Sequence, residues 1–165
     1  MNKTIDFSPE DFRETLEELF AFIPYFEERV NGTFKFQYYD GEKKQLVDYD
    51  GYEEKNRVAK FPDPMYDSKF ERFKCILFEK IWNKLGLGFG FRPPHPQEKE
   101  LSPDELFWFI LYELIRDVVH ERMCTGNTAS CMASGTYLNE LKVLQGIMNK
   151  EINSIKDIEA MYNNQ

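Results

Sequence analysis

The residues that could carry chemistry gather between positions 119 and 145, where one helix is predicted to end and a leucine-spaced helix to begin. An imidazole, a guanidinium, a thiol and free backbone amides can ligate metals, bind anions or serve in nucleophilic catalysis. The residues of this stretch that carry such groups form our candidate ligand site: His120, Arg122, Cys124, Gly126 and Asn127.

A metal site is one interpretation of this stretch. His120 and Cys124 are four residues apart, Cys131 follows seven later, and Glu121 could complete a tetrahedral zinc site. Zinc ligands usually occur as closely spaced pairs, however, and cysteine is common in cores as a small hydrophobic residue. We therefore expect neither a metal nor another cofactor.

A second interpretation makes Cys124 a nucleophile and His120 its base. The neighbouring Arg122 would favour the thiolate. A catalytic base must also be oriented by a third group, and the chain has neither a G-x-S-x-G motif nor a cysteine-protease signature. The catalytic residues stay unassigned, and our interpretation leans towards a protein that is not an enzyme.

The backbone after the helix offers a third interpretation, an anion site. Gly126, Asn127 and Thr128 precede a short helical run, so their N–H groups could hold a phosphate or carboxylate with help from Arg122. A glycine that ends one helix before a capped second helix explains the same residues without a ligand. We favour that explanation. A small-molecule or anion-binding domain, or an enzyme, with its pocket at the Arg122–Gly126 turn is the alternative function.

An aromatic and basic stripe runs along the helix that leads into this stretch. Trp108, Tyr112 and Arg116 recur every four residues, which places them on one helix face. These residue types are enriched at binding hot spots, although they also close the edges of ordinary cores. We take the three as candidate interface residues. The leading hypothesis is a non-catalytic protein-interaction module whose ligand is a protein partner or a second copy of the chain.

Caps and periodicity predict the helices that position these residues. Ser8 and Ser102 each precede a proline and two acids, which is typical of a helix start, and Ser68 is expected to cap a further helix. Pro24 and the Asn31-Gly32 pair are expected to end the first helix. Two more helices are predicted from about residue 136 through residue 162.

Between residues 33 and 61 the period changes from helical to alternating. Phe34, Phe36 and Tyr38 alternate with other side chains as on a strand, and an Asp-Gly turn then leads to a return strand. Because a lone hairpin is marginal in water, we expect a small antiparallel sheet packed on the helices. The predicted fold is α+β, mostly helical, in a single domain of residues 1–165.

Composition and charge narrow the class of protein. The chain is 42% hydrophobic with a net charge of −8, so it has material for a core but lacks the Lys/Arg clusters of nucleic-acid-binding proteins. It shows no signal-peptide core and no apolar run of about 18 residues that could cross a membrane. The three cysteines lack CxxC spacing, which suits a reducing compartment. We expect a cytoplasmic protein with neither nucleic acid nor membrane as partner.

The C-terminal part contains Glu121-Arg122-x-Cys124-x-Gly126, Ala129, Ser134-Gly135-Thr136, Leu138, Leu141 and Leu144. This pattern resembles a bacterial domain family of unknown function. The Ile23-Pro24-Tyr25-Phe26 run is also similar to the end of that family's first helix. The resemblance implies a bacterial origin and a similar fold, and it assigns no activity and no catalytic residue.

Overall fold

The computed structural model describes residues 8–31, 36–49, 52–53, 58–59, 68–85, 93–124 and 135–163, with the backbone alone for 36–40, 46–49, 52–53, 58–59 and 121–124. Its helical segments are η1 (Pro9–Phe12), α1 (Arg13–Phe20), α2 (Ile23–Val30), α3 (Ser68–Cys75), η3 (Ile76–Trp82), α4 (Pro103–Cys124), α6 (Thr136–Met148) and α7 (Ile155–Asn163). Its strands are β1 (Phe36–Asp40), β2 (Gln45–Tyr49), β3 (Tyr52–Glu53) and β4 (Val58–Ala59).

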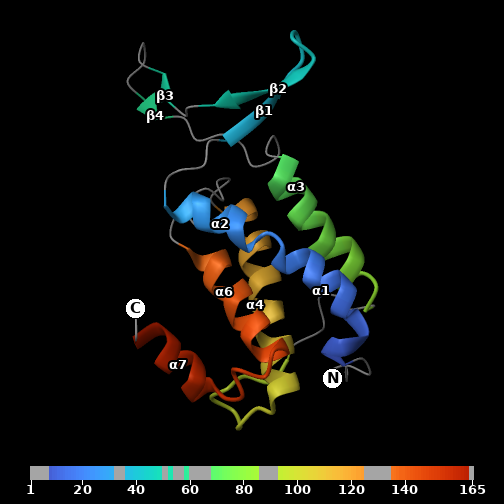
Figure 1. The fold of residues 1–165 in the computed structure, drawn as a ribbon, viewed down its shortest axis with the longest axis vertical. Helices are drawn as coiled ribbons and strands as arrows, with labels where there is room; N and C mark the ends of the chain where they lie inside the picture. The colour runs from blue at the N-terminus through green and yellow to red at the C-terminus, as the bar shows by residue number, and fades with distance from the viewer. Residues whose placement is uncertain are drawn as a thin grey trace.

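Helices build the core that the structure describes. α4 packs along α6, α1 packs against η3, and α2 crosses α6 (Figure 1). The ring of Tyr137 on α6 contacts two further helices, because it lies 5.7 Å from the ring of Phe26 on α2 and 6.2 Å from that of Phe70 on α3. The largest fully buried side chains include Leu16, Phe26, Phe70, Phe73, Phe107 and Tyr137.

The predicted α+β fold is wrong. β1 pairs with β2, with Phe36 opposite Tyr49, and β3 pairs with β4 in a separate two-stranded ladder. The strands contact chiefly one another and lie together at one end of the molecule (Figure 1). The described buried core consists of residues from the helices and the short segments between them. In the part of the chain that the structure describes, the helices bury their apolar faces on each other, so this part is helical rather than α+β.

The first predicted helix is divided into three segments. η1 begins where the N–H of Ser8 donates to the Asp11 carboxylate at 2.8 Å. α1 ends at Phe20, and α2 starts so that Pro24 is its second residue, where a helix does not need the missing N–H. Pro24 has no N–H to donate to the carbonyl of Phe20, four residues earlier, where α1 ends. Asn31 is the C-cap of α2 as expected.

The central helix α4 begins where the sequence predicts. The N–H of Glu105 donates to Ser102 Oγ, and the N–H of Ser102 donates to Glu105 Oε1, both at 3.2 Å. This reciprocal pair satisfies two donors that the first turn leaves without a helical partner. Among the residues that the structure describes, no helix combines the length and the apolar character that a bilayer crossing needs.

The predicted single helix after Ser68 changes its geometry halfway. Beyond Cys75 it continues as η3, a π-helix, in which the N–H of Asn83 donates to the carbonyl of Phe78, five residues earlier. The wider turn buries Ile81 and leaves Trp82 half-buried. This change of helix type places an indole beside α4.

Candidate functional site

The predicted ligand site falls mostly outside the described residues. α4 continues through Arg122 and Cys124, but their side chains are not described, and Gly126 and Asn127 lie outside the described ranges. His120 is exposed near the end of α4. The structure therefore does not test whether these residues form a pocket, and this site stays a prediction.

The predicted interface stripe on α4 divides into a buried and a surface part. Trp108 is only 7% exposed, and its ring meets that of Phe12 edge-on, with 6.2 Å between ring centroids. Tyr112 is half-buried. Arg116 is exposed and forms an ion pair with Glu113 at 2.5 Å. Trp108 is thus a core residue, while Tyr112 and Arg116 can contact a partner.

An apolar groove lies between η3 and α4, and we name it the aromatic groove. Its edge is formed by Trp82 and Tyr112, both half-buried, with ring centroids 6.1 Å apart and ring planes inclined by 36°. Its free volume of about 10 Å³ is far below that of small-molecule sites. The groove is therefore not a small-molecule site. Its lining residues are Ile81, Trp82, Leu85, Trp108, Leu111, Tyr112 and Ile115.

A buried carboxyl cluster connects the central helices. Burial above all, and then a hydrogen bond with Asp117 of α4, raise the pKa of Glu140 of α6 to about 10. Glu140 is therefore protonated at neutral pH. Burial likewise raises the pKa of Glu113, against the effect of Arg116. On α7, burial and then the charge of Glu140 raise the pKa of Tyr162.

The chemistry open to this cluster is limited by its surroundings. A carboxylic acid kept neutral can act as a proton donor, but Glu140 is not among the residues that line the aromatic groove. Within the described ranges no group of three acidic, histidine or cysteine side chains has a geometry that could hold a metal ion. We therefore interpret the Glu140–Asp117 pair as a polar link between helices.

Sequence reasoning missed Glu140. Tyr137, Leu141 and Leu144 on the same helix are fully buried, and Glu140 lies three residues after the first and four before the last. A helix places such positions on one face. The detectable signal was therefore a carboxylate at a core position of an otherwise apolar stripe.

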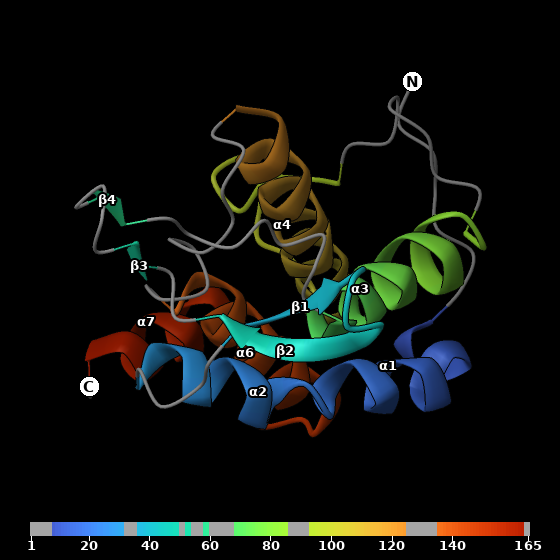
Figure 2. The same ribbon diagram turned by 90° about the horizontal axis from the view of Figure 1, so that it is seen from above.

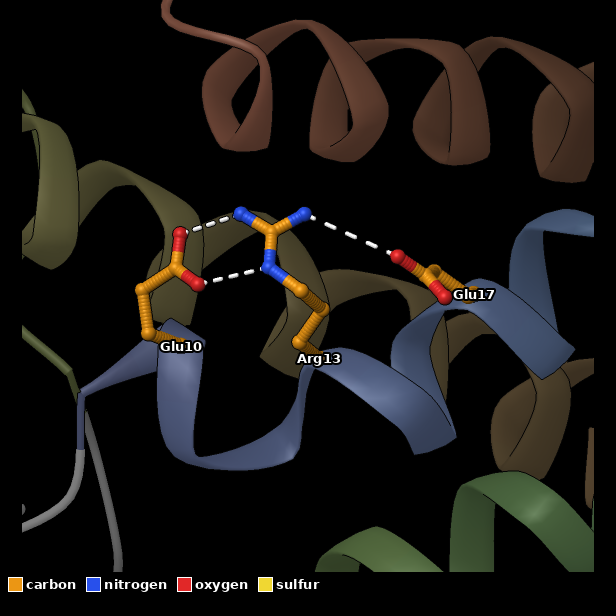
Figure 3. A network of polar contacts seen from close by, with 3 residues as sticks. All are labelled: Glu10, Arg13 and Glu17. Atoms are coloured by element: carbon orange, nitrogen blue, oxygen red, sulfur yellow. Dashed lines mark hydrogen bonds and ion pairs between the residues drawn. The ribbon is translucent and has the colours of Figure 1, made fainter.

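A larger cavity, the α1–α6 pocket, was also not predicted. It has a volume of about 360 Å³, within the range of small-molecule sites. Figure 3 shows Arg13, one of its lining residues, between two carboxylates: its Nε donates to Glu10 at 2.6 Å, and its Nη1 lies 3.7 Å from Glu17 Oε1. The pocket residues are Arg13, Glu17, Phe20 and Ala21 on one wall and Gln145, Met148 and Asn149 on the other.

Comparison with known proteins finds no match to this chain among family models, curated proteins or solved structures. The resemblance of the C-terminal signature to a bacterial domain family therefore stays a prediction.

Proposed function

We propose that this protein is a non-catalytic interaction module that associates with a second copy of itself through the aromatic groove. The observation that carries the proposal is the Trp82–Tyr112 pair, two large rings that are half-buried at the edge of an apolar groove. Tryptophan and tyrosine dominate interface hot spots because they bury much area with few rotatable bonds.

A second copy is the partner that this surface favours most simply. A two-fold contact needs only one patch, which packs on the same patch of the other copy. Aromatic side chains suit such a contact, because rings can interleave by stacking or by edge-to-face packing. Arg116 and Glu113 lie on the same helix as Tyr112 and form an ion pair. In a two-fold contact, Arg116 of each copy could pair with Glu113 of the other copy.

A cytoplasmic location belongs to the same proposal. Cys75 is a free thiol in the structure, and free thiols persist in reducing compartments. A contact through one small groove buries little surface area. Small interfaces are typical of associations that form and dissociate readily.

Light scattering coupled to size-exclusion chromatography tests the proposal over a hundredfold range of protein concentration. We expect the average mass to rise from monomer towards dimer. Tyr112→Ser removes a groove ring and should weaken association by about tenfold, the effect of roughly 1.4 kcal/mol. Tyr112→Phe keeps the ring and should associate like the wild type.

Ile155→Ser is the matched control for this experiment. Ile155 is 40% exposed on α7, and Figures 1 and 2 both place α7 on the far side of the bundle from α3 and η3. The control should dimerise normally. A monomer at every concentration, or equal weakening by both serine variants at unchanged circular dichroism, would overturn the proposal.

A further inference from the structure

The guanidinium of Arg13 lines the α1–α6 pocket, and two of its three nitrogens, Nε and Nη2, donate to Glu10. These two hydrogen bonds fix the plane of the group. Glu17 lies on the other side, and its Oε1 is 3.7 Å from Nη1, beyond hydrogen-bond distance (Figure 3). The pocket therefore offers a cation and an anion side by side, with the cation held in place from outside.

The rest of the pocket adds an apolar surface and amide groups. Phe20 and Met148 are both largely buried, at 9% and 8% exposed, and line the pocket from α1 and from α6. Gln145 and Asn149 line the α6 wall and carry both hydrogen-bond donors and acceptors. A ligand matched to this pocket has opposite charges close together and an apolar group.

We propose that the α1–α6 pocket binds a free α-amino acid with an apolar side chain. The ligand carboxylate accepts hydrogen bonds from the Arg13 guanidinium, the ammonium donates to Glu17, and the side chain lies on Phe20 and Met148. This site is separate from the aromatic groove, which is built by η3 and α4.

The spacing of the charges supports this class of ligand. In an α-amino acid the ammonium nitrogen and the carboxylate carbon are roughly 2.5 Å apart, short enough to meet Nη1 of Arg13 and Oε1 of Glu17, which are 3.7 Å apart. Arginine binds carboxylates through paired N–H groups. The cavity of about 360 Å³ lies at the small end of ligand sites, which favours a molecule of amino-acid size.

Titration followed by amide NMR chemical shifts tests the proposal with three probes. L-leucine carries both charges, leucinamide lacks the carboxylate, and 4-methylpentanoate lacks the ammonium. We expect leucine to cause saturable shifts at residues 13–21 and 145–149. Each analogue should bind roughly tenfold more weakly, because each loses one charge-assisted contact.

Three variants assign the two charged contacts. Arg13→Gln and Glu17→Gln should each weaken leucine binding roughly tenfold. Glu14→Gln makes the same charge change on the same helix outside the pocket lining and should leave binding unchanged. Absence of saturable shifts in the pocket overturns the proposal. So does equal binding of the three probes, or equal affinity of the Glu17→Gln and Glu14→Gln variants.

Discussion

Glu140 on α6 and Asp117 on α4 are two acids that interact between the central helices: burial first, and then Asp117, raise the pKa of Glu140 to about 10. Unlike a salt bridge, this interaction depends on one of the two acids staying neutral. Its stability therefore depends on pH in a defined direction.

Glu140→Gln should raise stability near neutral pH. The pKa of Glu140 rises from 4.5 to about 10 on folding. Between these pH values the folded state holds a proton that the unfolded state has released, so wild-type stability falls as pH rises. The side-chain amide of glutamine still offers a hydrogen-bond donor to Asp117, but it takes up no proton on folding. We expect the unfolding free energy of the variant minus that of the wild type to be about 1–3 kcal/mol larger at neutral pH than at pH 4.

Urea denaturation of both proteins across this pH window measures the effect. The difference in unfolding free energy between variant and wild type should grow steadily with pH. A constant difference would show that Glu140 is ionised in the folded protein.

Glu18→Gln should weaken the attachment of α1 to the α3–η3 helix. The Glu18 carboxylate accepts a hydrogen bond from Arg72 and another from Lys80, the latter at 2.8 Å. The hydrogen bond from Lys80 is the largest cause that lowers the pKa of Glu18. The stabilisation by these contacts is present above the ordinary glutamate pKa. It is lost as pH falls through the lowered pKa that Glu18 has in the folded protein. Since the groups are partly exposed, we expect a loss of about 0.5–1 kcal/mol.

Glu14→Gln is the control for that measurement, because Glu14 is an exposed glutamate of the same helix. Thermal unfolding at neutral pH should separate the two variants, and their difference should vanish in acid. If they unfold alike at neutral pH, the contacts of Glu18 with Arg72 and Lys80 do not stabilise the fold.

Gly146→Ala should destabilise the turn between α6 and α7. A Cβ on Gly146 would lie 2.6 Å from Ile152 Cδ1 and 3.0 Å from its Cγ1. Ile152 is buried, and its N–H donates to the Gly146 carbonyl at 3.1 Å, so it has little freedom to move. Overpacking of about 1–3 kcal/mol outweighs the helix propensity that alanine gains, which is about 1 kcal/mol.

Two further variants sharpen the Gly146 prediction in chemical denaturation. Gly41→Ala places its Cβ where no atom lies within 4 Å and should change stability by less than about 0.5 kcal/mol. Ile152→Val removes Cδ1, so it should suffer less from Gly146→Ala than the wild type does. Strict additivity of the two substitutions would contradict the predicted clash.

Self-association through the aromatic groove should strengthen with salt. Each copy carries a net charge of −8, and salt screens the repulsion between two such copies. Raising the ionic strength from about 0.01 M to about 0.15 M shortens the screening length from about 30 Å to about 8 Å. Sedimentation velocity should then show more dimer, whereas a dimer that dissociates on adding salt would indicate an interface dominated by attractive ion pairs.

The sequence by itself determined the features that depend on neighbouring residues. The start of α4 could be predicted because Ser102 and Glu105 satisfy each other within one turn. The short terminal helix could be predicted for the same reason, since the N–H of Asn153 donates to Asp157 at 2.8 Å. Such contacts join residues three or four positions apart, and their spacing is visible in the chain.

Only the tertiary structure decided which residues meet across helices. The position of Trp108 on a mixed helix face did not reveal that it is buried, and the pairing of Glu140 with Asp117 depends on how α6 lies along α4. The α+β prediction failed for the same reason, because alternation describes a strand but not what the strand packs against. Local spacing fixes which face a residue lies on, whereas burial and long-range pairing depend on how those faces pack.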